Sequence, residues 1–189
     1  MTYALTNPPL AEPLTLAQVK AHMRIDGSDE DDLLLSLLRT AREHLERTTG
    51  LALIAQAFRL YLVCWPESGI VEIARGPVKA IDEIRVFDAN GEEAIISLAG
   101  HVLDGNARPA RLYLRQRPVP GEPLNGIEID FTAGFGDTGA DVPDALKRAM
   151  LTHVARMYEF RGAVAPDQQP ADVPEGYERL VAPFLMKRL

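Results

Sequence analysis

The stretch Ile127–Gly162, IEIDFTAGFGDTGADVPDALKRAMLTHVARMYEFRG, carries the clearest structural signals in this chain of 189 residues. Its first six residues alternate between apolar and polar side chains, which predicts a strand with one buried face. From Leu146 to Tyr158 the apolar residues recur at helical spacing, which predicts a long helix. The glycine-rich sequence GFGDTG lies between the two, so the stretch predicts a strand, a turn and a helix in direct succession.

The loop Gly134–Gly139 matches the dinucleotide-binding pattern G-x-G-x-x-G. In a true site the third glycine lies inside the helix whose N-terminus binds the pyrophosphate. Here Pro143 sets the helix start, because proline is tolerated in the first turn and pushes the preceding residue out of helical geometry. The third glycine is therefore expected in the loop, and Asp141 and Asp144 would repel a pyrophosphate. We expect a structural turn and not a phosphate site.

The composition is that of an ordinary globular protein, with 47% apolar and 25% charged residues. The net charge of −7 argues against general binding of nucleic acid through phosphate neutralisation. The single cysteine, Cys64, excludes an internal disulfide, and its apolar neighbours predict a half-buried strand end. There is no apolar run long enough to span a bilayer and no signal-peptide pattern at the N-terminus, so no membrane association is expected.

The N-terminal part predicts an extended arm followed by two helices. Three prolines among the first 13 residues favour the arm. Thr15 and Gln18 have the spacing of a capping box, which opens a short helix that runs through Met23. Ser28 is then expected to cap a longer helix, and Gly50 to end it. The acidic run just after Ser28 suits the first turn of this helix, and it lacks the ligand order of a calcium loop.

Residues 56–133 predict antiparallel β structure. Their short alternating segments are separated by short turns, with no helix long enough for a parallel crossover. Asn90 and Gly91 form a strong hairpin-turn signal. The expected strands cover residues 56–64, 70–73, 81–87, 94–98, 102–103, 111–114 and 127–132.

Together these segments predict an α+β fold in a single domain, residues 1–189. Two N-terminal helices within residues 15–50 and a long C-terminal helix at residues 143–162 form a helical bundle. An antiparallel β subdomain is inserted at residues 56–133. The Pro-rich residues that follow predict a flexible tail, residues 163–189, which ends in a short amphipathic helix interrupted by Pro183.

No motif for catalysis or metal binding is present. The chain lacks a nucleophile elbow, a Walker loop and any zinc-type spacing of cysteine and histidine. His44 and His153 fall on charged helices, which favours a surface or helix-contact role. We therefore expect no catalytic, cofactor-binding or metal-binding residues, no cofactor and no enzyme activity. The alternative from another functional class is a small nucleotide-binding enzyme that uses the Gly134–Gly139 loop.

The densest basic cluster follows residue 107. Only Tyr113 lies near it as a stacking aromatic, which is a weak signal for nucleic acid. A solvated or partner-facing hairpin is the better interpretation. The cluster consists of Arg108, Arg111, Arg115 and Arg117.

Three blocks of the sequence resemble the head–tail connector (adaptor) family of tailed bacteriophages, which includes gene transfer agent adaptors. The first is LTLAQVKAHMRIDGSDEDDLLLSLLRTAREHLERTTG, Leu14–Gly50. The second is FTAGFGDTGADVPDALKRAMLTHVARMYEFRG, Phe131–Gly162, and the third is the β segment between them. The resemblance covers about residues 14–162. The paired N-terminal helices favour an adaptor over a stopper or a tail terminator.

The resemblance implies a structural virion protein in the neck of the particle, assembled in the cytoplasm of the bacterial host. Family members form a ring, typically dodecameric, beneath the portal protein, and dock neck, stopper or tail proteins. DNA then passes through the ring without sequence-specific binding, and an acidic wall would not trap it.

Two sets of residues are expected to serve this assembly. The long N-terminal helix would offer a charged outer face as a subunit interface, comprising Arg39, Arg42, Glu43, Glu46 and Arg47. The amphipathic tail would contact the portal or would pack on its own subunit, two alternatives that the sequence leaves open. Its residues are Tyr177, Leu180, Val181, Phe184 and Leu185.

Overall fold

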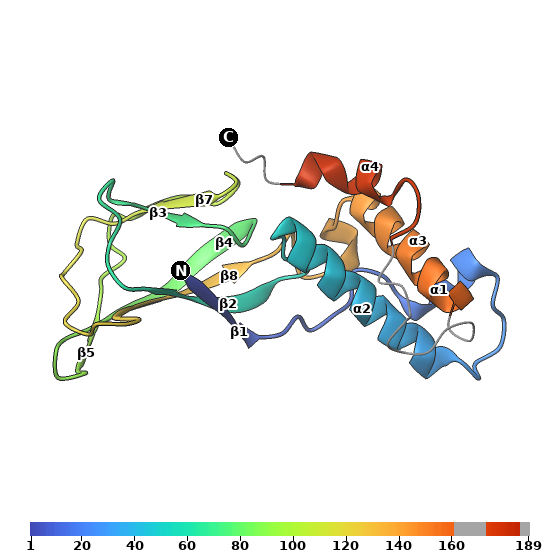
Figure 1. Cartoon of the computed structure of the whole chain (residues 1–189), viewed down its shortest axis with the longest axis horizontal. Helices are drawn as coiled ribbons and strands as arrows, with labels where there is room; N and C mark the ends of the chain where they lie inside the picture. Colours follow the sequence, from blue (N-terminus) through green and yellow to red (C-terminus); the bar gives the residue numbers. More distant parts are fainter. Residues whose placement is uncertain (161–172, 186–189) are drawn as a thin grey trace. The chain divides into compact units, whose positions relative to one another are not determined.

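The computed structural model describes residues 1–160 and 173–185 (Figure 1). The α+β class predicted from the sequence is confirmed. The chain divides into two compact units, which we call the β unit (Met1–Leu10 and Ala55–Phe135) and the helical unit (Ala11–Ile54 and Gly136–Leu189). The single domain over residues 1–189 stays a prediction, and the two units are described separately.

The β unit contains two antiparallel sheets. The larger has the order β1-β2-β8-β4-β5, and the smaller has the order β3-β7-β6. The strands of the larger sheet are β1 (Thr2–Asn7), β2 (Gln56–Leu62), β8 (Ile127–Ala133), β4 (Val78–Phe87) and β5 (Glu93–Ile95). The strands of the smaller sheet are β3 (Ile70–Ile73), β7 (Ala110–Tyr113) and β6 (Val102–Asp104).

The strand β1 corrects the expectation of a simple extended arm, because residues 2–7 pair with β2 at the edge of the larger sheet. The sequence of β1 lacks a clear apolar alternation, and its burial pattern is accordingly irregular. Cys64 is also exposed and not half-buried, because β2 ends two residues before it. The other predicted strands all appear, residues 70–73 with the predicted ends and the rest with shifted ends.

The core of the larger sheet follows from the alternation that the sequence shows in β2 and β8. Alternate residues of both strands are buried, and Phe58 is paired with Phe131 in register. The two rings stack with centroids 5.6 Å apart, and Tyr3 of β1 packs its ring edgewise on Phe131. The opposite face of the sheet is charged, as expected for a sheet with one solvated side.

Arginines on that charged face are paired with carboxylates. Arg59 of β2 donates two hydrogen bonds to Asp130 of β8, at 2.6 and 2.8 Å, and contacts Glu128 at 2.8 Å. Arg85 of β4 donates to Asp130 at 2.9 Å. These bonds hold the pKa of Asp130 below its ordinary value despite partial burial, and the hydrogen bond from Arg59 has the largest effect. The face is therefore a neutralised network and does not form a basic patch.

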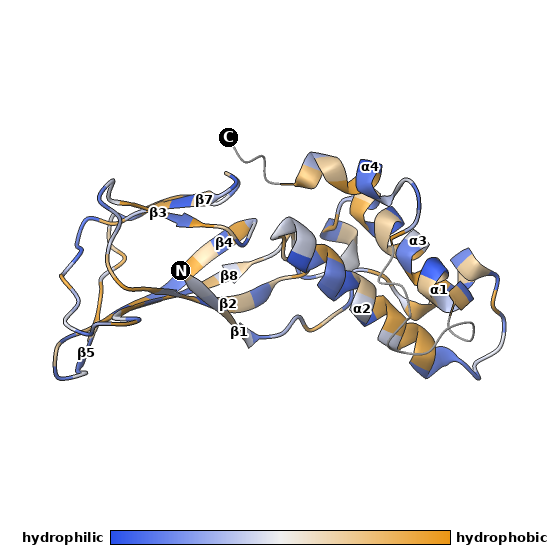
Figure 2. Cartoon of the chain, viewed as in Figure 1, coloured by the Kyte–Doolittle hydropathy of each residue, from blue (hydrophilic) through white to orange (hydrophobic). Residues whose placement is uncertain are grey.

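The described part of the helical unit contains three longer helices and a short one near its C-terminal end. They are α1 (Leu16–Met23), α2 (Asp31–Thr49), α3 (Asp144–Phe160) and α4 (Tyr177–Val181), with 3-10 turns at Gly139–Asp141 and Ala182–Phe184. Helix α2 shows hydrophilic and hydrophobic residues along the same ribbon (Figure 2). Its buried residues include Leu34, Leu38, Ala41 and Leu45, the apolar stripe predicted from the sequence.

The starts of the first two helices differ from each other. The capping box of α1 is confirmed, because Thr15 Oγ1 accepts from the Gln18 amide and Gln18 Oε1 accepts from the Thr15 amide. The cap expected at Ser28 is wrong, since α2 begins at Asp31 with no side-chain cap. Instead, the Ser28 carbonyl accepts from the Asp31 amide, and Lys20 of α1 bonds the Asp31 carboxylate at 2.7 Å. The contact with Lys20 ties the first turn of α2 to α1 but does not cap the helix.

The GFGDTG sequence forms the turn that leads into α3. Thr138 and Asp141 form a capping box, in which the Asp141 carboxylate accepts from the Thr138 amide at 3.0 Å. This amide is the kind of donor that an anion would need, so the loop's own carboxylate takes the place of a phosphate. Helix α3 begins at Asp144, directly after Pro143, which confirms the predicted start.

Gly139 is required at this turn because the chain passes close to it. A Cβ on Gly139 would lie 2.3 Å from the carbonyl oxygen of Pro13, a backbone atom that cannot swing away. We expect Gly139→Ala to lower the free energy of unfolding of the helical unit by roughly 2 kcal/mol or more, measured by urea titration of the far-UV circular dichroism signal. Gly27→Ala is the matched control, since nothing lies within 4 Å of its Cβ position. Equal effects of the two substitutions would contradict this role for Gly139.

Some predicted features lie outside the described residues. The flexible tail was expected over residues 163–189, of which residues 173–185 are described. No helix in the described ranges combines the length and apolar character that crossing a membrane requires.

Candidate functional site

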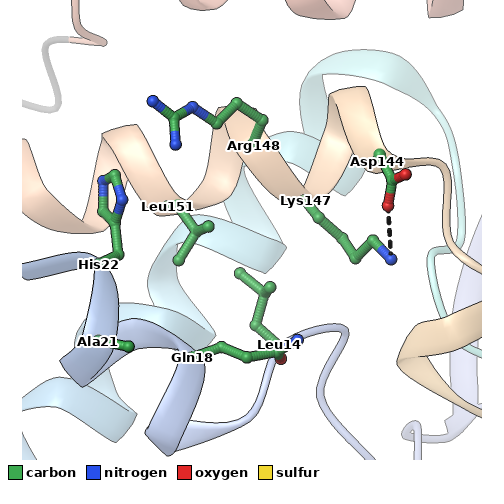
Figure 3. A pocket seen from close by; sticks show the side chains of 8 residues that line it. All are labelled: Leu14, Gln18, Ala21, His22, Asp144, Lys147, Arg148 and Leu151. Carbon is green, nitrogen blue, oxygen red and sulfur yellow. Dashed lines mark ion pairs between the residues drawn. The ribbon is translucent and has the colours of Figure 1, made fainter.

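A groove lies between α1 and α3 in the helical unit. Its volume is about 590 Å³. Figure 3 shows Leu14 and Leu151 between the two helices, with Lys147 reaching toward Asp144. The lining residues are Leu14, Gln18, Ala21, His22, Asp144, Lys147, Arg148 and Leu151.

The sequence positions these side chains through two local features. The capping box of α1 fixes Gln18 at the first turn, so that Ala21 and His22 follow one turn later. On α3, Lys147 and Leu151 are four residues apart and therefore lie on one face of the helix. The result is a partly apolar floor with a polar rim.

The rim of the groove is positively charged. Lys147 is neutralised by Asp144 at 2.9 Å, but Arg148 is exposed and makes no ion pair with any described residue. Burial, and secondly the charge of Arg148, lower the pKa of His22. An incoming carboxylate would therefore be attracted to Arg148.

The described residues that line the groove do not form a recognisable catalytic set. The groove holds no nucleophile beside a general base, and no group of three or more potential metal ligands occurs within residues 1–160 and 173–185. Sequence reasoning did not find the groove, because its residues come from two helices far apart in the chain.

Comparison with known proteins identifies the family. The sequence profile of the phage gp6-like head-tail connector protein family matches residues 13–103. One similar solved structure is the neck of a native GTA particle computed with C12 symmetry, with 30% identity and a TM-score of 0.80. The alignment covers 100% of this chain and 97% of that chain.

The chain belongs to the phage gp6-like head–tail connector family. Two further structures agree, the neck of an empty GTA particle computed with C6 symmetry (TM-score 0.84) and the virion of a native gene transfer agent (GTA) particle (TM-score 0.83). Each is 28% identical, with 100% of this chain and 97% of that chain covered. No curated protein matches the sequence. The resemblance stated above is confirmed, and the protein is a structural connector subunit.

The interface expected on α2 of this connector needs correction at two positions. Arg42 and Glu46 are only 7% and 8% exposed, so they do not lie on an outer face. Arg42 donates to Glu12 at 2.8 Å and to Glu46 at 2.9 Å, and Glu46 also accepts from the Leu53 amide at 2.9 Å. The two residues therefore hold α2 to the segments on either side of it. Sequence spacing alone cannot show this, because Glu12 and Leu53 lie outside the helix.

The remaining residues of the predicted α2 face are exposed. They are Arg39, Glu43 and Arg47. They remain available for contact with a neighbouring subunit, and that role stays a prediction.

The predicted portal-contact tail of the connector packs on its own helical unit within the described residues. Tyr177 and Val181 of α4 are 3% and 2% exposed, whereas Leu180 and Phe184 are half-buried and Leu185 is exposed. A 3-10 turn begins directly after α4, which agrees with the interruption expected at Pro183. Contact of Tyr177 with a portal would require α4 to leave this position.

Tyr177 packs on two histidines in an aromatic cluster that the sequence did not reveal. The His153 ring lies 5.0 Å from that of His44 and 5.6 Å from that of Tyr177. His153 is 1% exposed, and neither of its ring nitrogens nor the Tyr177 hydroxyl has a hydrogen-bond partner among the described residues. Burial, with a smaller effect of His44, lowers the pKa of His153 to about 4, and burial raises the pKa of Tyr177 to about 12.

The basic cluster of the connector lies on and around β7, in the β unit. Arg111 bonds Asp104 of β6 at 2.6 Å, and the Arg117 guanidinium lies 5.7 Å from the Tyr113 ring centroid. Burial lowers the pKa of Arg108. The cluster is thus partly tied to the sheet, in agreement with a hairpin that faces solvent or a partner.

Proposed function

We propose that this connector subunit assembles into a ring of twelve copies beneath the portal in the neck of a phage or gene-transfer-agent particle. The ring extends the DNA channel and docks neck, stopper or tail proteins. The observation that carries the proposal is the full-length similarity to a neck chain in a structure with C12 symmetry. The subunits are made in the bacterial cytoplasm and act in the virion.

A ring needs two different surfaces on each subunit, because each copy contacts one neighbour on either side. The exposed residues Arg39, Glu43 and Arg47 of α2 supply a charged surface of mixed sign. Arg42 and Glu46 are excluded from it, since they stabilise the subunit from inside. Mixed charges set the register of such an interface more than its affinity.

The tail is proposed to contact the portal after release of α4. Its exposed and half-buried residues, Leu185, Leu180 and Phe184, are the first points of contact. Tyr177 and Val181 would follow, since they are buried in the free subunit. The unpaired polar atoms of His153 and Tyr177 lower the cost of undocking α4, because those atoms regain water when it leaves.

DNA is proposed to pass through the ring without sequence-specific contact. The net charge of −7 supports this, since a wall that repels phosphate does not hold the strand. The arginines of the large sheet are paired with carboxylates and so add no free positive surface there.

Catalysis and nucleotide binding are not part of the proposal. The Asp141 carboxylate already accepts from the loop amide that a phosphate would use, which argues against the nucleotide-binding alternative. We expect NAD, NADP and ATP to leave the thermal unfolding midpoint of the purified subunit unchanged. A reproducible, saturable rise with any of them would favour that alternative.

Co-assembly with a portal tests the proposal directly. The purified chain is mixed with the portal protein encoded in the same genome, and the complex is weighed by native mass spectrometry. The expected product carries twelve copies of this chain on one portal ring. Absence of any complex at concentrations at which both partners are folded would contradict the proposal.

A further inference from the structure

The loop of residues 118–126, PVPGEPLNG, lies in the β unit and carries two exposed apolar side chains and one carboxylate, Glu122, which is half-buried. Val119 is 88% exposed and Leu124 is 73% exposed, so both side chains are accessible to a partner. Glu122 lies between them in the sequence. We call this segment the PVPGEPLNG loop.

The PVPGEPLNG loop is held in shape by the body of the β unit. The Trp65 indole donates to the Pro118 carbonyl at 2.7 Å, and the Gly121 amide donates to the Phe87 carbonyl at 2.8 Å. The Phe87 amide donates in turn to the Gly126 carbonyl at 2.9 Å. Three prolines further restrict the backbone. A loop that is already ordered loses little conformational entropy when it binds.

The groove between α1 and α3 has the complementary chemistry. Its apolar lining consists of Leu14, which is buried, Leu151, which is half-buried, and Ala21, which is exposed. Ala21 and Leu151 therefore offer apolar surface to Val119 and Leu124. Its rim carries the exposed Arg148, which has no ion pair among the described residues. A segment with two apolar side chains and a carboxylate therefore fits it in both hydrophobicity and charge.

We propose that the PVPGEPLNG loop of one subunit binds the α1–α3 groove of a second copy, with Glu122 facing Arg148. This inference rests on the proposed ring and adds one pair of surfaces to the charged face of α2. The loop and the groove are different patches of the same chain, which is what a head-to-tail contact requires. The same pair then repeats around the ring.

Paramagnetic relaxation between subunits tests the contact without requiring a stable ring. A nitroxide is attached at Gln116→Cys in a Cys64→Ser background, next to the loop but outside the proposed contact. These subunits are mixed with ¹⁵N-labelled wild-type subunits, so that only contacts between copies broaden the observed signals. We expect broadening at the amides of Gln18, His22 and Leu151. Absence of broadening at these amides would overturn the inference.

Charge exchange makes the test specific. We expect Arg148→Glu in the ¹⁵N subunit to weaken the association about tenfold or more, because like charges then meet. Glu122→Arg in the nitroxide-labelled subunit should restore it. Arg179→Glu, the same change at an exposed position on α4, is the control and should leave groove broadening intact. Broadening that survives Arg148→Glu without the compensating change would also overturn the inference.

The result separates this inference from the proposed function. A twelve-copy ring on the portal with no groove broadening between free subunits would overturn the loop–groove contact alone. Groove broadening with no portal complex would overturn the proposed function alone and leave the contact between copies standing.

Discussion

Replacing Glu46 by alanine is expected to destabilise the helical unit by about 3–5 kcal/mol, one of the two largest effects anticipated for this protein. The substitution removes a carboxylate that pairs with buried Arg42 and that accepts from the Leu53 amide. Burial lowers the pKa of Arg42, but the charges and hydrogen bonds of Glu46 and Glu12 outweigh it and leave that pKa raised. Loss of Glu46 leaves a buried cation and a buried amide with fewer partners.

Urea unfolding followed by circular dichroism at 222 nm measures this loss. Glu43→Ala is the matched control, because it removes the same group from an exposed position on the same helix, where its contact with Arg42 is longer, at 3.7 Å. We expect its effect to stay within about 0.5 kcal/mol. The fluorescence of Trp65, the only tryptophan, reports the β unit separately. If both variants were equally stable and only assembly failed, Glu46 would be an interface residue after all.

Acidification is expected to destabilise the helical unit by about 3 kcal/mol through His153, since each unit of pKa shift is worth about 1.4 kcal/mol. The pKa of His153 falls from 6.5 in the unfolded chain to about 4 in the folded protein. Folding therefore excludes a proton from the buried ring. The stability is fully present above pH 6.5, declines as the pH falls below it, and is lost by about pH 4. The pKa of His44 is also lowered, mainly by burial and secondly by the charge of Arg47, so His44 adds to the loss of stability on acidification.

The variant His153→Phe isolates this effect. Phenylalanine keeps the ring beside His44 and Tyr177 but has no proton to bind and no nitrogen to satisfy. We expect the dependence of the urea midpoint on pH between 6.5 and 4 to flatten, while stability at pH 7 stays equal or rises. His101→Gln, in the β unit, is the control and should keep the wild-type slope. An unchanged slope in His153→Phe would show that other groups control acid unfolding.

The elements that the sequence predicts well are those specified by local signals. Pro143 fixes the start of α3, and the Thr15–Gln18 pair fixes that of α1. Alternation in residues 127–133 fixes β8 and the face that it buries. Each signal acts over a few residues, so no tertiary contact is needed to interpret it.

The predictions that failed depend on contacts between distant residues. Ser28 does not cap α2, because the helix begins at Asp31, whose carboxylate bonds Lys20 of α1. Arg42 was predicted to lie on the outer face of α2, but it is buried and pairs with Glu12, thirty residues away. Likewise, the first strand was missed because its sequence is weak and its pairing with β2 spans more than fifty residues.

The two candidate surfaces also combine features that the sequence predicts with features that depend on contacts between distant residues. The composition of the PVPGEPLNG loop is visible in the sequence, but its exposure and its bonds to Trp65 and Phe87 are not. The groove joins Leu14 to Leu151, so only the folded helical unit reveals it. The family resemblance predicts a ring assembly, but it does not identify the surfaces through which the subunits contact each other.

A reconstruction of the neck of a particle that carries this chain tests the central claim most directly. The protein is tagged at an exposed site, and the neck is imaged by electron cryomicroscopy without imposed symmetry. The account predicts twelve copies of the chain in one ring between the portal and the tail components. A neck that lacks the chain, or holds it as a single copy outside the DNA channel, would contradict the account.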